Sequence, residues 1–298
     1  RTVTVKKYKA IFFDWDGTAV VSRKASADQV AKPMKRLLAE GVKLAIISGT
    51  TMENIAGGRL HEYFTPEERR NLFLGLGRGA YNYSFDEKGQ LFLLEEKIPV
   101  KEEILKIHDI CYEIHRLLLQ TYEIPTDIVF SRPNYCKIDL MVGNQRGDAL
   151  FLQEGEREEL LFLLEKHGFR GGIKGMIALA ERIGKKYGMD VSATTDAKYL
   201  EVGISSKSDN ADILYGFLQR EYGITDAECS FWGDEYVGFG EGIYGSDSFM
   251  MTEKTKGGDF FDVSHTEGER PEGVRKIGGG VDGFMKFLEE QSMFWSET

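Results

Sequence analysis

The chain has 298 residues, of which 42% are hydrophobic and 29% are charged, and its formal net charge is -10 at pH 7. This length indicates one large or two medium domains with a sizeable core. The acidic balance argues against a nucleic-acid-binding protein. No apolar run approaches the roughly 18 residues of a membrane span. The three cysteines show neither a disulfide framework nor zinc-site spacing. Because the residues shown also carry no signal peptide, we expect a cytoplasmic protein.

Two buried strands joined by a helix are predicted near the start of the chain. Residues 8–13 form an apolar run that ends at Asp14. Residues 28–40 carry apolar side chains at helical spacing, and residues 42–47 form a second apolar run that ends at Ser48. Strand, helix and strand in this order predict a parallel sheet. Ligands bind at the carboxyl ends of such strands, which is where both polar residues fall.

The middle of the chain predicts helices alternating with antiparallel hairpins, which indicates an α+β module inserted into an α/β domain. The glycine-rich stretch 75–79 is expected to mark the crossing into this module. We therefore assign residues 1–81 and 201–298 to the core and residues 82–200 to the insertion. The predicted helices cover 101–120, 155–167 and 173–187, and the predicted strand pairs are 127–130 with 137–142 and 190–194 with 199–204.

The parallel pattern returns after the insertion. Residues 209–222 are predicted to form a helix and residues 230–232 a short strand. Residues 253–280 are rich in Gly and charged residues and predict long loops, before a closing helix at 281–290. The expected fold class is α/β, with a Rossmann-like parallel sheet and an inserted α+β domain.

The strongest chemical signal is Asp14-Trp15-Asp16-Gly17-Thr18, directly after the first strand. Two carboxylates two residues apart repel each other and are costly to bury, and a divalent cation removes that cost. Magnesium prefers oxygen ligands and keeps several waters. One carboxylate can then attack phosphorus while the other handles the leaving-group proton. The alternative is a surface Asx turn, because Asp and Gly populate turns freely.

Further polar side chains follow the other predicted elements. Asp234 and Glu235 come directly after the strand at 230–232, and Asp247 follows in the next loop. The Ser48 hydroxyl and the Lys207 ammonium could bind a phosphoryl group. Each residue alone would indicate a polar loop or a solvated surface. Together they supply a nucleophile, an acid/base, metal ligands and a charge clamp, which phosphoryl transfer requires.

This set of motifs, in this order, resembles the haloacid dehalogenase superfamily of phosphotransferases. The resemblance covers residues 8–55 and 200–250, roughly the two ends of the chain. It implies that Asp14 forms an aspartyl-phosphate and that Asp16 is the general acid/base. The implied phosphoryl-binding residues are Ser48, Gly49 and Lys207. The implied magnesium ligands are Asp14, the Asp16 carbonyl and Asp234.

One departure from the family pattern concerns the last acidic motif, which often reads Gly-Asp-x-x-Asn-Asp. Val237 and Gly238 occupy the final two positions here. Either Glu235 or Asp247 must therefore take the second acidic role at the metal.

The position of the insertion resembles the large-cap subgroup, which includes phosphosugar phosphatases, Cof-like phosphatases and phosphomannomutase. Two segments are similar to the cap hairpin on which phosphomannomutases place arginines for a substrate phosphate. By that resemblance Arg132 and Arg146 would form an anion clamp, although two exposed arginines near turns remain the alternative. The segments are Ser131-Arg132-Pro133-Asn134 and Gly143-Asn144-Gln145-Arg146.

The predicted function is that of a Mg²⁺-dependent phosphohydrolase acting on a small phosphorylated metabolite, with a sugar phosphate as the expected substrate. A phosphosugar mutase is the first alternative, and it would require Arg132 and Arg146 as a second phosphate site. A non-catalytic sugar-phosphate-binding protein is the second alternative, because fold and motif do not by themselves establish activity. No nucleic-acid or membrane partner is expected.

Overall fold

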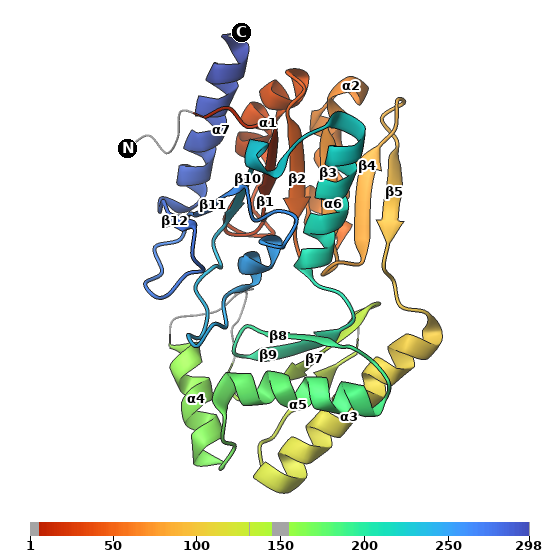
Figure 1. Cartoon of the computed structure of the whole chain (residues 1–298), viewed down its shortest axis with the longest axis vertical. Helices are drawn as coiled ribbons and strands as arrows, with labels where there is room; N and C mark the ends of the chain where they lie inside the picture. The colour runs from red at the N-terminus through yellow and green to blue at the C-terminus, as the bar shows by residue number, and fades with distance from the viewer. Residues whose placement is uncertain (1–5, 131, 145–154, 298) are drawn as a thin grey trace. The chain divides into compact units, whose positions relative to one another are not determined.

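The computed structural model describes residues 6–130, 132–144 and 155–297 (Figure 1). The chain divides into two compact units. The core unit comprises Arg1–Lys97 and Ser206–Thr298, and the inserted unit comprises Ile98–Ser205. Within the described residues, no helix is both long and apolar enough to cross a bilayer.

The core unit contains an eight-stranded sheet in the order β12-β11-β10-β1-β2-β3-β4-β5. All neighbouring strands pair in parallel except β3 with β4 and β4 with β5, which are antiparallel. The expected Rossmann-like, mainly parallel sheet is thereby confirmed. The strands are β1 (Ala10–Phe13), β2 (Lys43–Ile47), β3 (Leu72–Leu76), β4 (Tyr81–Phe85), β5 (Leu91–Glu96), β10 (Cys229–Gly233), β11 (Asp259–Asp262) and β12 (Val274–Lys276).

The register of the central strands brings the predicted polar residues to one edge. Phe13 lies opposite Ile46 of β2 on one side and Trp232 of β10 on the other. The three strands run in the same direction, so their carboxyl ends lie next to one another. The residues that follow them, with Asp14 first, must therefore gather at this edge.

Helices cover both faces of the sheet, which explains why the central strands read as continuous apolar runs. Along β1, Ile11 and Phe13 pack into the core beneath α1 (Asp28–Ala39) and α7 (Gly280–Ser296). Ala10 and Phe12 alternate with them and face the cluster that includes α6 (Lys207–Tyr222). Trp15 and Trp232 are fully buried core residues.

The core unit is larger than predicted because β4 and β5 extend its sheet. The glycine-rich stretch 75–79 does not mark a crossing into the insertion, since it forms the end of β3 and the turn to β4. The division falls after Lys97 and before Ser206, later than the expected limits at 81 and 200. The region 253–280 contains β11 and β12 in addition to loops.

Short helices fill the remaining connections of the core unit, and α7 is longer than the predicted 281–290. The short elements are α2 (Pro66–Arg69) and the 3-10 helices Met52–Asn54, Ala56–Gly58, Leu60–Tyr63, Asp226–Glu228 and Ser246–Met250.

The inserted unit combines helices with a four-stranded sheet in the order β6-β7-β9-β8, in which every pair is antiparallel. The predicted helices and strand pairs of this region are present, although the strands predicted at 137–142 and 190–194 lie at 135–139 and 192–195. The strands are β6 (Asp127–Val129), β7 (Tyr135–Asp139), β8 (Ser192–Thr195) and β9 (Tyr199–Gly203), and the helices are α3 (Lys101–Tyr122), α4 (Glu156–Lys166) and α5 (Gly172–Lys186).

Candidate active site

The candidate site lies at the carboxyl edge of the core sheet. The Asp14 N–H donates to the Trp232 carbonyl at 3.0 Å, and the Ser48 N–H donates to the Gly75 carbonyl at 2.9 Å. These bonds continue the strand pairing by one residue, so each polar side chain begins from an ordered backbone position. Asp14 and Ser48 are both buried.

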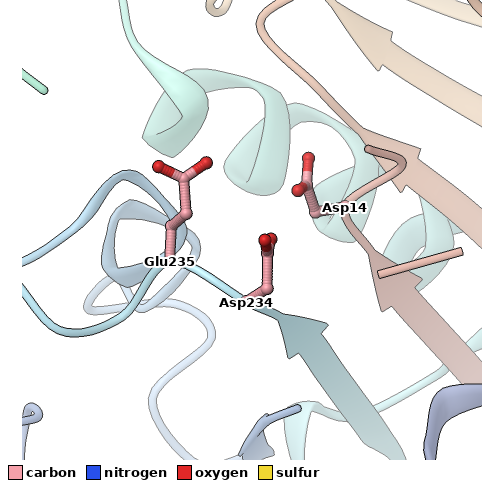
Figure 2. A group of neighbouring side chains, drawn as sticks. All are labelled: Asp14, Asp234 and Glu235. Atoms are coloured by element: carbon pink, nitrogen blue, oxygen red, sulfur yellow. The ribbon is translucent and has the colours of Figure 1, made fainter. Parts of the chain in front are cut away.

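Three carboxylates form a cluster at this edge. Asp14, Asp234 and Glu235 each offer an oxygen, and these oxygens all lie within 4.8 Å of one another. Figure 2 shows the three side chains extending to the same side, with Asp234 between the other two. Such a group of hard oxygen atoms suits a divalent cation of the magnesium class.

The Gly17 turn allows the two strand ends to approach closely. Gly17 has a φ of +84°, and a Cβ at this position would lie 2.2 Å from Oδ2 of Asp234. The neighbouring Thr18 hydroxyl donates to Oδ1 of Asp234 at 3.3 Å. The turn after β1 thus lies directly against the Asp234 side chain, which follows β10. Glycine is required at position 17 because any larger side chain would occupy the space that Asp234 fills.

Lys207 brings a buried positive charge to the cluster. It is the first residue of α6, whose N-cap is the Ser206 hydroxyl. Its Nζ lies 3.3 Å from Oδ1 of Asp14 and 2.9 Å from Oδ1 of Asp247. The Lys207 ammonium therefore lies between the carboxylates of Asp14 and Asp247 and pairs with both.

Asp247 organises the loop after β10 and is not a member of the three-carboxylate cluster. It is fully buried, and its Oδ2 accepts the N–H groups of Asp234 at 3.0 Å and Glu235 at 2.8 Å. The sequence left open whether Glu235 or Asp247 takes the second acidic role, and in the structure it is Glu235 that lies in the cluster. Asp247 instead accepts the backbone N–H groups of Asp234 and Glu235 with one oxygen and pairs with Lys207 through the other.

Burial and like charge make this site electrostatically unfavourable without a cation. Burial raises the pKa of Asp14 to about 7, although Lys207 opposes the shift. Burial, and then the charges of Glu235 and Asp14, raise the pKa of Asp234 well above its usual value. Burial alone would lower the pKa of Lys207, but the charges of Asp14 and Asp247 raise it above the usual range.

Asp16 lies apart from the cluster and faces a residue that the sequence did not single out. Its Oδ2 lies 3.5 Å from Nε of Arg23. Its Oδ1 is buried and has no hydrogen-bond partner within the described residues. Burial raises the pKa of Asp16, and Arg23 opposes that shift. Nothing in the sequence around Arg23 distinguishes it from an ordinary loop arginine.

The remaining predicted residues occupy different places. The Ser48 hydroxyl accepts the Thr50 N–H at 3.3 Å, and Gly49 between them is exposed. Arg132 lies in the connection between β6 and β7 of the inserted unit and is half-buried. Arg146 lies outside the described residues.

Comparisons with known proteins identify the fold. No family model matches the chain, and no curated protein matches it either. Among solved structures, an N-terminally truncated IMP-nucleotidase from Plasmodium falciparum aligns with a TM-score of 0.57 at 13% identity, covering 96% of this chain and 70% of that one.

A second solved structure gives the same result. The trehalose-6-phosphate phosphatase from Aspergillus fumigatus aligns with a TM-score of 0.56 at 15% identity, covering 95% of this chain and 92% of that one. Both alignments span the core and the insertion. The chain therefore shares the fold of these two proteins, in which a mainly parallel α/β sheet carries an inserted α+β domain, and this is the fold class that the sequence predicts.

Proposed function

We propose that the chain is a Mg²⁺-dependent phosphohydrolase that acts on a small phosphorylated metabolite, with a sugar phosphate as the expected substrate. One observation carries the proposal. The Asp14 carboxylate belongs to the three-carboxylate cluster and is also paired with Lys207. A nucleophile, a metal site and a phosphate-binding cation thus meet at one carboxylate, as phosphoryl transfer requires.

The donor set fits magnesium. The cluster supplies only carboxylate oxygens, and it contains no His or Cys ligand that would favour zinc. The metal would be held by Asp14, Asp234 and Glu235, together with the main-chain carbonyl of Asp16. When bound, magnesium supplies positive charge that neutralises the carboxylates and polarises the phosphoryl oxygens.

The protein residues account for both halves of the reaction. In the first, an Asp14 oxygen bonds to phosphorus, the ester P–O bond breaks, and Asp16 gives its proton to the leaving oxygen. In the second, Asp16 takes a proton from water, the water oxygen bonds to phosphorus, and the aspartyl P–O bond breaks to release inorganic phosphate. The free, buried Oδ1 of Asp16 suits a proton carrier, because no described residue occupies it.

Ser48, Gly49 and Lys207 are proposed to bind the phosphoryl group. The Ser48 hydroxyl can donate to a phosphoryl oxygen while it accepts the Thr50 N–H. The Gly49 position is open, since a Cβ there would meet nothing within 4 Å. Lys207 offers three N–H donors, of which its two carboxylate partners use two.

The inserted unit is proposed to act as a cap that recognises the non-phosphate part of the substrate. Two proteins of this fold are named for a nucleotide and for a sugar phosphate, IMP and trehalose-6-phosphate. Both names denote small phosphate monoesters, which supports the proposed substrate class.

The three cysteines are buried and unbridged, which supports a reducing compartment such as the cytoplasm.

The test is phosphate release from a panel of sugar phosphates and nucleotides, including trehalose-6-phosphate and IMP, with Mg²⁺ and with EDTA. Magnesium-dependent release that vanishes in Asp14→Asn would support the proposal. Isomerisation of a sugar phosphate without release would replace the hydrolase with a mutase. Binding of a phosphate ester without turnover in the wild type would replace it with a non-catalytic binding protein.

A further inference from the structure

Two buried asparagines form an amide network beside the candidate site. Asn210 and Asn82 are both fully buried. The Gly79 N–H donates to Oδ1 of Asn210 at 2.8 Å, and Nδ2 of Asn210 donates to Oδ1 of Asn82 at 2.8 Å and to the Leu76 carbonyl at 3.4 Å. Nδ2 of Asn82 donates to the carbonyls of Gly79 at 3.3 Å and Glu95 at 3.4 Å. Both amides therefore have donor and acceptor partners, as buried amides require.

The network joins the first turn of α6 to the end of β3. Lys207 begins this turn, and Asn210 lies three residues later. Gly75 makes the approach possible, because a Cβ on it would lie 2.8 Å from Cβ of Asn210. The Gly75 carbonyl also accepts the Ser48 N–H. One residue of β3 thus fixes both Ser48 and the turn that carries Lys207.

The other side chains of this turn make contacts elsewhere in the core unit. Asp209 pairs with Lys97 at 3.0 Å, but both side chains are partly exposed, and such pairs contribute little. The Ser208 hydroxyl donates to the Phe249 carbonyl at 2.8 Å and holds α6 to the loop that carries Asp247. Asn210 is the residue of this turn whose side chain hydrogen-bonds to the end of β3 and to the turn that follows it.

We propose that Asn210, through Asn82, is a positioning residue for phosphoryl binding. It sets the distance between the Lys207 ammonium and the Ser48 hydroxyl, so that both groups reach one phosphoryl unit. This role rests on the function proposed above. The effect on the metal is expected to be smaller, because the cluster residues follow β1 and β10, and Asp14 is linked to this turn through Lys207.

Calorimetric titration of inorganic phosphate in the presence of Mg²⁺, and of Mg²⁺ alone, separates positioning from simple stabilisation. Asn210→Ala should weaken phosphate binding about ten- to hundredfold, because it removes the three hydrogen bonds by which the Asn210 side chain holds this turn to Leu76, Gly79 and Asn82. Magnesium affinity should change less than about threefold. Leu214→Ala is the matched control, since Leu214 also packs against Gly75 from α6 but makes no hydrogen bond to the β3–β4 turn.

A double-mutant cycle with Lys207→Ala provides the decisive comparison. If Asn210 acts by placing Lys207, Asn210→Ala should cause little further loss of phosphate affinity once Lys207 is absent. Asn82→Ala removes the oxygen that accepts from Nδ2 of Asn210 but leaves Asn210 in place. If Asn210→Ala does not fold, Asn82→Ala replaces it in the cycle with Lys207→Ala.

Three outcomes would overturn the inference. Equal phosphate affinity in Asn210→Ala and Leu214→Ala would reduce the network to a structural role. Full additivity with Lys207→Ala would show that the asparagine acts elsewhere. Absence of phosphate binding in the wild type with Mg²⁺ would refute the proposed function and this role together, whereas the first two outcomes refute this role alone.

Discussion

Asp14→Asn should stabilise the metal-free protein at alkaline pH although it removes the proposed nucleophile. Burial raises the pKa of Asp14 from 3.8 to about 7. The folded state therefore binds this proton more tightly than the unfolded state, and stability falls as the pH rises from about 4 to about 7. At about 1.4 kcal/mol per pKa unit, the ionised carboxylate costs at most about 4 kcal/mol above pH 7. Asparagine cannot ionise, so this cost disappears.

Thermal melting in EDTA at pH 8 and pH 4.5 tests the reasoning. For a domain of this size each kcal/mol corresponds to roughly 2–4 °C, so Asp14→Asn should melt at most about 8–16 °C higher at pH 8. At pH 4.5 the difference should fall to about 1 kcal/mol, because the folded wild-type carboxyl is then protonated while the unfolded one is only partly so. Asp190→Asn is the control, since Asp190 is an exposed aspartate paired with Lys185 and should give no gain. Equal or lower melting of Asp14→Asn at pH 8 would refute the electrostatic account.

Three further changes test other parts of the site. Gly17→Ala should reduce magnesium affinity at least tenfold, because its Cβ would lie 2.2 Å from Oδ2 of Asp234. Gly41→Ala is the control, since Gly41 has a similar φ of +89° but no atom within 4 Å of a Cβ, and this change should lower only the melting temperature. Asp247→Asn should destabilise the protein by about 3–5 kcal/mol in urea titration, because Lys207 loses a buried charged partner and the new amide NH2 group must face either Lys207 or the two backbone N–H groups of Asp234 and Glu235. Lys207→Met should abolish phosphate release and lower the melting temperature more at pH 8 than at pH 4.5, since the unpaired Asp14 carboxylate is neutral at acid pH. A pH-independent loss would contradict the last expectation.

Much of the site is predictable from the sequence because its determinants are local. The strands β1, β2 and β10 are short apolar runs followed at once by the polar residues Asp14, Ser48 and Asp234. These runs are continuously apolar because both faces of the sheet are buried, and the parallel arrangement brings the carboxyl ends of the strands together. The burial stripe of α3 was predictable for the same reason, since helical spacing is a local property.

The parts that were not predictable depend on long-range contacts. β5 carries exposed Leu and Phe side chains at the edge of the sheet and shows no alternation, so nothing local marked it as a core strand. The position of Asp247 depends on how the loop after β10 folds back onto its own first two amides. The pairing of Asn210 with Asn82 joins residues 128 positions apart, and neither asparagine has a distinctive sequence context.

The charges of the site explain why a metal ion is expected to precede the substrate. When ionised, Asp14, Asp234, Glu235 and Asp247 carry four negative charges against the single positive charge of Lys207. Asp234 has no cationic partner within the described part of the chain. A phosphate dianion approaching this buried group would meet net repulsion that water cannot screen effectively. A divalent cation cancels two of the three excess charges, and Lys207 can then offer its remaining donor to the phosphoryl oxygens. Under the proposed function, the cluster that lowers the stability of the metal-free protein is therefore also the feature expected to make phosphate binding depend on magnesium.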